Sequence, residues 1–112
     1  MVSNLLKRKF RILEVVSQIK SPGLRKRVLE DLSIDPEIFK SLSEICKNIA
    51  VGNIRLSANE KAKLKRHRHG IIGLAQRPKE KQIQKNLVIQ SGKYLPLVVE
   101  IAGEVLSELL SS

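Results

Sequence analysis

Hydrophobic residues recur every three or four positions over most of the chain, the spacing that places them along one side of an α-helix. This spacing predicts helices over residues 4–19, 22–32, 36–50, 58–76, 79–90 and 95–110. Leu87-Val88-Ile89 is β-prone, but three residues are too few to predict a strand. We therefore expect an all-α protein, a compact bundle of about five or six short helices.

Capping residues mark several of the expected helix boundaries. Ser21-Pro22 and Asp35-Pro36 each place a capping side chain before a proline, which is favoured at the first helical position. Ser57 and Glu60 have the spacing of a capping box, in which each side chain accepts a hydrogen bond from the other residue's backbone N–H. The residues expected to end helices are Gly52-Asn53, Arg77-Pro78 and Ser91-Gly92.

The same periodicity predicts which residues face the core. In helix 22–32 these are Leu24, Val28 and Leu32, with Arg25, Lys26 and Arg27 facing outward. In helix 58–76 they are Leu64, Ile71, Leu74 and Ala75, and in helix 79–90 they are Ile83, Leu87 and Val88. Gly70 and Gly73 lie inside helix 58–76, where glycine is unfavourable, so they predict a kink or a close contact between helices.

Composition supports a single small domain, or a small domain with a tail. The chain has 112 residues, of which 42% are hydrophobic but only 3% aromatic, so Leu, Ile and Val must form the core. No N-terminal segment has the length and polarity of a signal peptide, and no hydrophobic run approaches a membrane span. We expect a soluble intracellular protein that is not secreted. Its single cysteine, Cys46, is expected to be a small buried residue.

Charge divides the chain into three parts. Residues 1–54, an N-terminal helical part, carry ten Lys/Arg and six acids. Residues 55–85 carry ten Lys/Arg against two acids, and residues 86–112 carry one Lys against three Glu. Most of the net charge of +10 therefore lies in the middle of the chain. We interpret residues 55–91 as a basic helical part that binds nucleic acid, and residues 92–112 as a hydrophobic C-terminal helix.

The most basic run, residues 61–69, has seven cationic or potentially cationic residues out of nine. On one helix they would be separated by about 1.5 Å per residue along the axis and would repel one another. A phosphate backbone would relieve this repulsion and gain affinity from counterion release. The candidate nucleic-acid-binding residues are Arg55, Lys61, Lys63, Lys65, Arg66, His67, Arg68, His69, Arg77, Lys79, Lys81 and Lys85.

The partner expected from this pattern is DNA, contacted mainly through its phosphate backbone, with RNA as an alternative. Alternatively, the cations of residues 61–69 form a solvated helix face and bind no partner. Residues 22–50 could imitate a helix-turn-helix, but the helix that would read the groove is acidic. His67 and His69 are two residues apart and therefore point in different directions on a helix, so we expect no metal site and no cofactor. No catalytic constellation is evident, and we do not expect an enzyme.

The C-terminal helix is hydrophobic around most of its circumference. Glu100, Glu104 and Glu108 recur every four residues and form one narrow acidic stripe. Such a helix must bury its hydrophobic side in the core, in a second copy of the chain or in a membrane interface. The three acids make an anionic membrane an unlikely partner, and we expect the core or a homo-oligomer.

Two stretches carry a resemblance to a known family. They run from Leu56-Ser57 through Leu64-Lys65-Arg66-His67 to Leu74-Ala75, and from Lys85 through Leu87-Val88-Ile89-Gln90-Ser91-Gly92-Lys93-Tyr94 to Leu95-Pro96-Leu97. Over about residues 54–110 the chain resembles the small basic core proteins of adintoviruses and of the related Maverick (Polinton) elements. These proteins are similar to adenovirus core protein X (Mu).

The resemblance implies a virion core protein that condenses a DNA genome, made in the nucleus of the host and packaged into the virion. It also implies a viral maturation protease as a partner, because such precursors are cut after a hydrophobic-x-Gly-Gly sequence. The corresponding residues are Ile89-Gln90-Ser91-Gly92, so the cleavage junction would be Gly92–Lys93, with Ser91 in place of the first glycine.

Three hypotheses follow from the sequence. The chain is a DNA-condensing core protein, a helical protein-interaction module whose charge gives solubility, or the precursor of a membrane-active viral peptide. The first of these accounts best for the charge distribution.

Overall fold

The computed structural model describes the backbone of residues 3–111 and the side chains of residues 3–105. The described part is all-helical and contains no strand, which confirms the predicted fold class. Its elements are α1 Asn4–Ser17, α2 Pro22–Leu32, α3 Pro36–Ala50, α4 Ala58–Lys65, α5 Arg68–Ala75, α6 Lys81–Gln90, the 3₁₀ helix η1 Ser91–Lys93, and α7 Leu95–Ser111. There are thus seven α-helices where five or six were expected.

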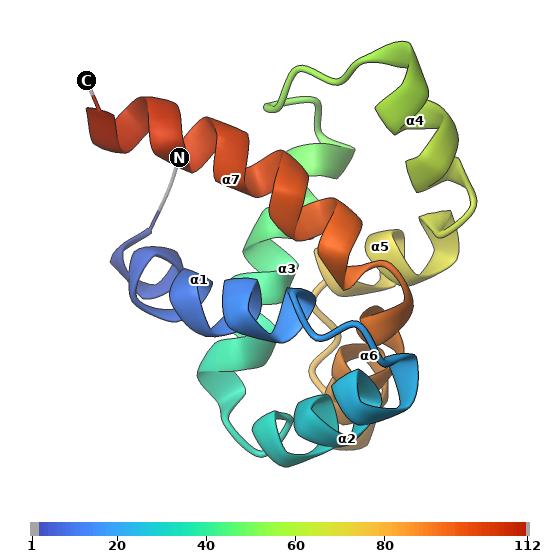
Figure 1. The fold of residues 1–112 in the computed structure, drawn as a ribbon. Coiled ribbons are helices and arrows are strands. Elements are labelled where there is room, and N and C mark those ends of the chain that lie inside the picture. Colours follow the sequence, from blue (N-terminus) through green and yellow to red (C-terminus); the bar gives the residue numbers. More distant parts are fainter. Residues whose placement is uncertain (1–2, 112) are drawn as a thin grey trace.

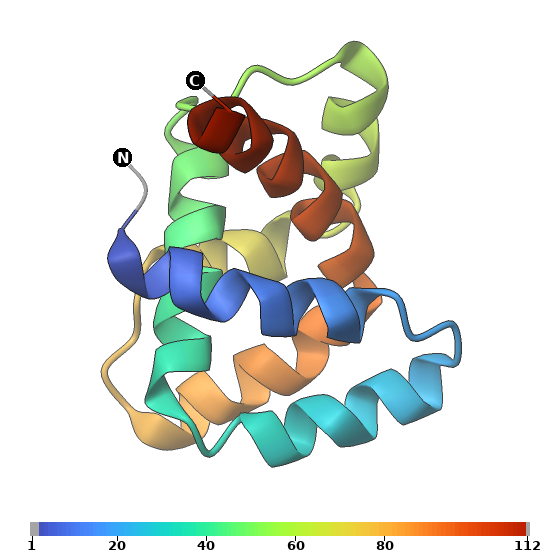
Figure 2. The same cartoon turned by 60° about the vertical axis from the view of Figure 1, so that its left-hand side comes forward.

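The central helix is α3, which packs against α5, α1, α6 and α7 (Figure 1). Helices α2 and α6 lie side by side at one end of the molecule, and α4 projects at the other end in both views (Figures 1 and 2). The largest fully buried hydrophobic side chains are Leu13, Leu29, Ile38, Leu42, Ile45, Leu74, Leu95 and Ile101. The core is therefore aliphatic, as the scarcity of aromatic residues requires.

The capping residues expected from the sequence are confirmed. Ser21 accepts from the N–H of Leu24, and Asp35 accepts from the N–H of Glu37. Ser57 and Glu60 form both hydrogen bonds of a capping box at the start of α4. These contacts form between residues two or three apart, which is why the sequence alone predicts them.

The single helix expected over residues 58–76 is instead two helices, α4 and α5, joined by a turn at Arg66-His67. The periodicity could not reveal this break, because Leu64 and Ile71 keep helical spacing across it and are both buried. The break falls inside the cationic run Lys65-Arg66-His67-Arg68, where repulsion between neighbouring charges weakens a continuous helix.

The two glycines of α5 mark close contacts and not the break. A Cβ at Gly70 would lie 2.8 Å from the hydroxyl oxygen of Tyr94, and a Cβ at Gly73 would lie 3.1 Å from Cδ2 of Leu87. Of the two predicted alternatives, a kink or a close contact between helices, the structure shows the close contact, between Gly73 of α5 and Leu87 of α6.

The predicted inward side of α2 is confirmed for Val28 and Leu32, which pack against the core, and wrong for Leu24 and Arg25. Leu24 is 52% exposed, whereas Arg25 and Leu29 are buried and Val28 and Leu32 are half-buried. Arg25 faces inward because its guanidinium donates hydrogen bonds to the carbonyl of Ile19, at 3.0 and 3.2 Å, and to the carbonyl of Gly92, at 2.6 Å. A buried arginine with these partners is not evident from hydrophobic periodicity.

Four other residues that were predicted to be buried can be compared with the structure: three in α6, and Cys46 in α3. In α6 Val88 is buried and Leu87 half-buried as expected, but Ile83 is 43% exposed. Cys46 is fully buried as expected, and burial raises the pKa of its thiol to about 12, which keeps it protonated.

The first turns of α7 pack into the core of the same chain. Val98, Val99, Ile101 and Ala102 are buried there, while Glu100 and Glu104 are exposed. Glu108, the third acid of the stripe, lies outside the described side chains. Among the helices described, none is long and hydrophobic enough to span a bilayer.

Candidate nucleic-acid interface

The cations of residues 55–85 all lie at the surface. Each of the ten Lys and Arg side chains belongs to an exposed residue: Arg55, Lys61, Lys63, Lys65, Arg66, Arg68, Arg77, Lys79, Lys81 and Lys85. Within residues 3–105, where side chains are described, none of them forms an ion pair. Of the two acids in the same segment, Glu60 is engaged in the capping box of α4. The positive charge of this segment is therefore not neutralised by the described part of the chain.

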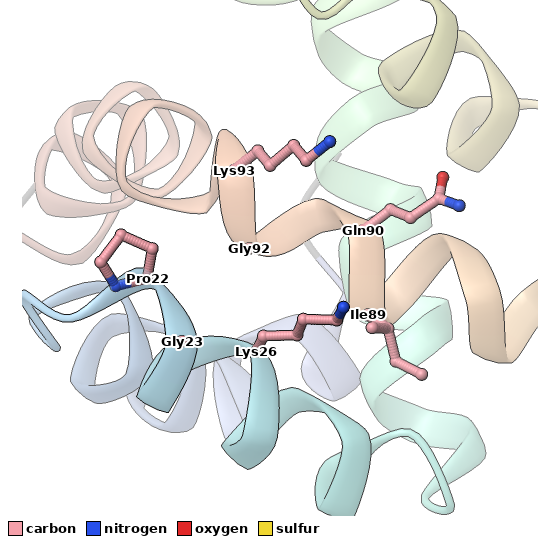
Figure 3. A pocket seen from close by; sticks show the side chains of 7 residues that line it. All are labelled: Pro22, Gly23, Lys26, Ile89, Gln90, Gly92 and Lys93. Atoms are coloured by element: carbon pink, nitrogen blue, oxygen red, sulfur yellow. The ribbon is translucent and has the colours of Figure 1, made fainter.

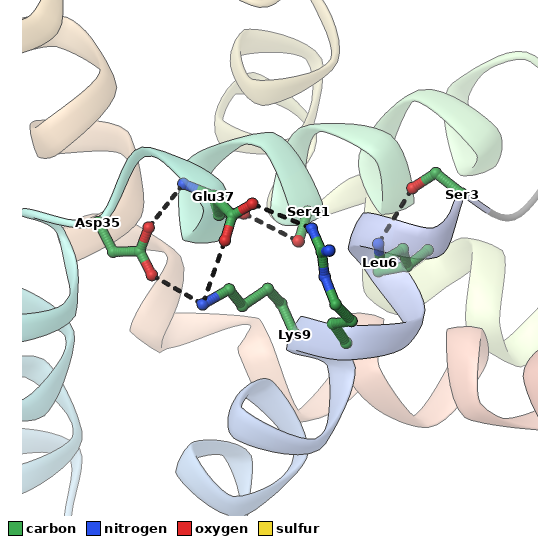
Figure 4. Close-up of polar contacts among 7 residues, drawn as sticks. Ser3, Leu6, Lys9, Asp35, Glu37 and Ser41 are labelled. Atoms are coloured by element: carbon green, nitrogen blue, oxygen red, sulfur yellow. Dashed lines mark hydrogen bonds and ion pairs between the residues drawn. The ribbon is translucent and has the colours of Figure 1, made fainter.

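The cations of α1 have a different environment. Lys9 lies 3.0 Å from Asp35 and 3.4 Å from Glu37, and Arg8 lies 3.2 Å from Glu37 (Figure 4). Arg11 pairs with Glu14 at 3.4 Å. These are the four ion pairs among the described side chains, and all involve α1. Acids of the N-terminal part thus pair with three of the four cations of α1, and among the described side chains none pairs with a cation of residues 55–85.

Five cations surround α4 and the start of α5, and we call them the α4–α5 cations: Lys61, Lys63, Lys65, Arg66 and Arg68. Lys61 and Lys65 are one helical turn apart and, with Arg68, edge a groove of about 210 Å³. The rest of that groove is hydrophobic and is lined by Ile49, Ala50, Leu56, Leu64, Ile71 and Ile72. Because α4 projects from the molecule, these cations are accessible to a large polyanion (Figures 1 and 2).

Of the five remaining cations, Arg55 lies in the connection between α3 and α4. The structure does not place the other four beside the α4–α5 cations. Arg77 and Lys79 lie with Lys40 and Glu44 along the middle of α3. Arg77 has a φ of 50° and its Nε donates a hydrogen bond to Oγ of Ser43 at 3.0 Å. Lys81 and Lys85 belong to α6, at the opposite end of the molecule from α4 (Figures 1 and 2). The cations that share one basic segment of the sequence are thus divided among three regions of the surface: around α4 and the start of α5, along α3, and on α6.

The two histidines occupy different environments. His69 is exposed, but His67 is half-buried and its ring lies 5.4 Å from the ring of Tyr94. His67 therefore helps to hold the α4–α5 turn against the core. The described residues contain no group of three His, Cys, Asp or Glu side chains that could hold a metal ion.

Two further cations, Lys26 and Lys93, lie together although they are far apart in the sequence. They line a groove of about 480 Å³ between the start of α2 and the end of α6, which we call the α2–η1 groove (Figure 3). The other lining residues are Pro22, Gly23, Ile89, Gln90 and Gly92. Neither lysine was among the binding residues predicted from the sequence. The run Arg25-Lys26-Arg27 was the only sequence signal for Lys26.

The junction Gly92–Lys93 is folded into η1. Gly92 is buried, and its carbonyl oxygen accepts the hydrogen bond from Nη1 of Arg25. Ser91, also buried, donates through Oγ to the carbonyl of Val88 at 2.6 Å. A protease could bind this peptide bond in extended form only after local unfolding.

Comparison with known protein families, with curated protein sequences and with solved structures finds no match to this chain. Its function is therefore inferred from its own residues.

Proposed function

We propose that this protein binds DNA without sequence preference, through the phosphate backbone, and neutralises and condenses a DNA genome as a virion core-like protein. The observation that carries the proposal is that ten Lys and Arg side chains of residues 55–85 are exposed and form no ion pair among the described side chains. Neutralising phosphates with such side chains releases counterions and supplies non-specific affinity. The resemblance over residues 54–110 favours DNA as the polyanion, with the nucleus and the virion as its expected locations.

Contact through phosphates is favoured over stacking on bases. Proteins that bind single strands generally present exposed aromatic side chains to successive bases. The three aromatic residues of this chain other than histidine are Phe10, Phe39 and Tyr94. Phe39 and Tyr94 are buried, and Phe10 is half-buried against the core. A duplex, whose phosphates are regularly spaced, suits this surface better than unpaired bases do.

The test is a titration of duplex DNA binding at several salt concentrations. Changing Lys63, Lys65 and Arg66 to Ala should reduce the slope of log K against log [salt] by up to about 2.7, or about 0.9 for each lost phosphate contact. The matched control changes Lys7, Arg27 and Lys47, three exposed cations outside residues 55–85, to Ala. The control removes the same net charge and should keep most of the slope.

Equal slopes of log K against log [salt] for the wild type and for the variant with Lys63, Lys65 and Arg66 changed to Ala would overturn the proposal. The same titration with double-stranded and single-stranded RNA tests the choice of DNA as partner. Tighter binding to RNA at equal salt concentration would replace DNA by RNA in the proposal.

A second candidate function is a protein-interaction module. It is favoured by the hydrophobic lining of the groove between α3, α4 and α5, beside which Ile72 is 46% exposed and Val51 60% exposed. This candidate predicts a defined oligomer by light scattering and no DNA binding at ~150 mM salt, where surface charges are largely screened.

A further inference from the structure

The α2–η1 groove is a second basic surface, separate from the α4–α5 cations. Lys26 and Lys93 flank it from two different elements, and none of the residues that line it is acidic (Figure 3). Lys85 lies one helical turn before Ile89, a lining residue, and therefore on the same side of α6. Two exposed lysines, Lys26 and Lys93, thus line a concave surface that has no carboxylate in its lining. By the same one-turn spacing, the exposed Glu30 lies on the side of α2 that carries Lys26.

The two sides of this groove are held together by a buried contact. Arg25, 9% exposed, donates from Nη1 to the carbonyl of Gly92 and from Nε and Nη2 to the carbonyl of Ile19. Lys26 directly follows Arg25, and Lys93 directly follows Gly92. The same contact therefore fixes the backbone on which both lysines stand. A surface fixed in this way loses less conformational entropy on binding an anion than a flexible one does.

Helix α4 lies at the opposite end of the molecule from α2 and α6, two of the elements that form the α2–η1 groove. Figures 1 and 2 differ by a rotation about the vertical axis, which leaves the height of each element unchanged. In both figures α4 is at the top, while α2 and α6 are at the bottom. The described part of the chain extends 35 × 30 × 29 Å. The two surfaces approach each other at η1, because Lys93 is followed by Tyr94, whose ring lies 5.4 Å from that of His67 in the α4–α5 turn. Lys26 of α2 is therefore the part of the groove that is set apart from α4.

From this arrangement we infer that the α2–η1 groove binds the phosphate backbone of a second duplex, so that one molecule bridges two DNA duplexes. The inference rests on the proposed function, because the first duplex is held by the α4–α5 cations. Bridging differs from neutralisation: it needs two surfaces on one molecule, and its loss need not weaken binding to a single duplex.

The experiment measures capture of one duplex by another. A biotinylated duplex is fixed on beads, the protein is added, and retention of a second, fluorescent duplex without biotin is recorded. Binding to a single duplex is measured in parallel by fluorescence anisotropy. The test variant is Lys26→Ala with Lys93→Ala, and the matched control is Lys7→Ala with Lys47→Ala. All four lysines are exposed, and circular dichroism verifies that both variants fold.

We expect the test variant to bind a single duplex within about twofold of the wild type but to capture about tenfold less of the second duplex. The control should capture as much as the wild type. Wild-type protein that binds one duplex and captures no second one would overturn the inference and leave the proposed function intact. Equal capture by the test variant and the wild type would also overturn it.

A third outcome would assign the groove to a single duplex. If the test variant loses affinity for one duplex by the same factor as it loses capture, both surfaces contact the same DNA and the inference is wrong. Wild-type protein that binds no duplex at all would overturn the proposed function and the inference together. Light scattering at the assay concentration identifies bridging by a dimer, which would contradict bridging by one molecule.

Discussion

At the scale of single residues, Arg25 is the polar side chain on which the packing of several elements depends. It is buried on α2, one helical turn before the fully buried Leu29. Its guanidinium donates hydrogen bonds to the carbonyl of Ile19, in the α1–α2 connection, and to the carbonyl of Gly92, in η1, and so joins these two segments. Hydrogen bonds from a charged donor are stronger than neutral ones, and a buried carbonyl that loses its donor is costly. Arg25 therefore stabilises a junction between segments that are distant in the sequence.

We expect Arg25→Met to lower the free energy of unfolding by about 1–3 kcal/mol, because methionine fills similar space but donates no hydrogen bond. Lys26→Met, the adjacent and exposed position, should change it by less than about 0.5 kcal/mol. Urea denaturation followed by circular dichroism measures both values. Equal effects of the two substitutions would mean that the hydrogen bonds of Arg25 add nothing to stability.

A second residue-scale prediction concerns Tyr94, which is 4% exposed. Its hydroxyl has no hydrogen-bond partner among the described residues, and burial raises the pKa of this hydroxyl, so it stays neutral. Because removing an unsatisfied buried hydroxyl removes a desolvation cost, Tyr94→Phe should leave the free energy of unfolding unchanged or raise it by up to about 1 kcal/mol. Tyr94→Ala also removes the ring and should lower it by about 3–5 kcal/mol. A clear loss of stability in Tyr94→Phe would show that the hydroxyl has a partner.

At the scale of elements, the start of α3 is tied to α1 through Asp35. The pKa of Asp35 is held below its ordinary value, chiefly by the backbone N–H of Glu37 and also by Lys9 (Figure 4). Because the folded state has the lower pKa, it favours ionised Asp35. This contribution to stability is present above the ordinary carboxyl value of about 3.9 and is lost as the pH falls through the folded value.

Asp35→Asn separates this titration from the capping role, because asparagine keeps an oxygen that can cap α3 but carries no charge. Between pH 5 and about pH 3 the stability of the variant should fall less steeply than that of the wild type. Thermal unfolding at several pH values measures both slopes. Parallel curves would show that Asp35 does not contribute to acid sensitivity.

The helix that carries Lys61, Lys63 and Lys65, α4, makes few contacts with the other helices. Leu64 is its one buried side chain, so its own capping box supplies much of its stability. Ser57→Ala should destabilise α4 locally by about 1 kcal/mol, with faster amide exchange over residues 60–65 and little change in global unfolding. Ser21→Ala, which removes the cap of the core-packed α2, should instead lower the global midpoint. If Ser57→Ala lowers the midpoint as much, α4 unfolds together with the core.

At the scale of the whole molecule, the net charge of +10 on 112 residues opposes compaction. Raising the salt concentration from ~10 to ~150 mM screens this repulsion and should raise the Tm. The rise in Tm with salt should be smaller when Lys63, Lys65 and Arg66 are changed to Gln, because this variant has three fewer positive charges that repel one another. Differential scanning calorimetry measures the shift. A Tm that falls with salt would mean that the ion pairs of α1 outweigh the repulsion.

Bridging of two duplexes is also a property of the whole molecule, because it depends on where the two basic surfaces lie and not on the total charge. A chain with the same composition and all its cations on one side would bind DNA with a similar salt dependence but could not join two duplexes.

The sequence by itself determined the helical class, the caps at Ser21, Asp35 and Ser57, and the exposure of the cations between residues 55 and 85. Caps and hydrophobic periodicity arise from contacts between residues at most a few positions apart, so they can be predicted from short segments.

Only the tertiary structure decided which side of α2 is buried, where the helix over residues 58–76 breaks, and how the cations divide. The contact that turns Arg25 inward is with Gly92, 67 residues away in the sequence. The same separation divides Lys26 from Lys93, which η1 and α2 bring to one groove. Local patterns contain no information about such partners, because their proximity results from the packing of helices that are not neighbours in the chain.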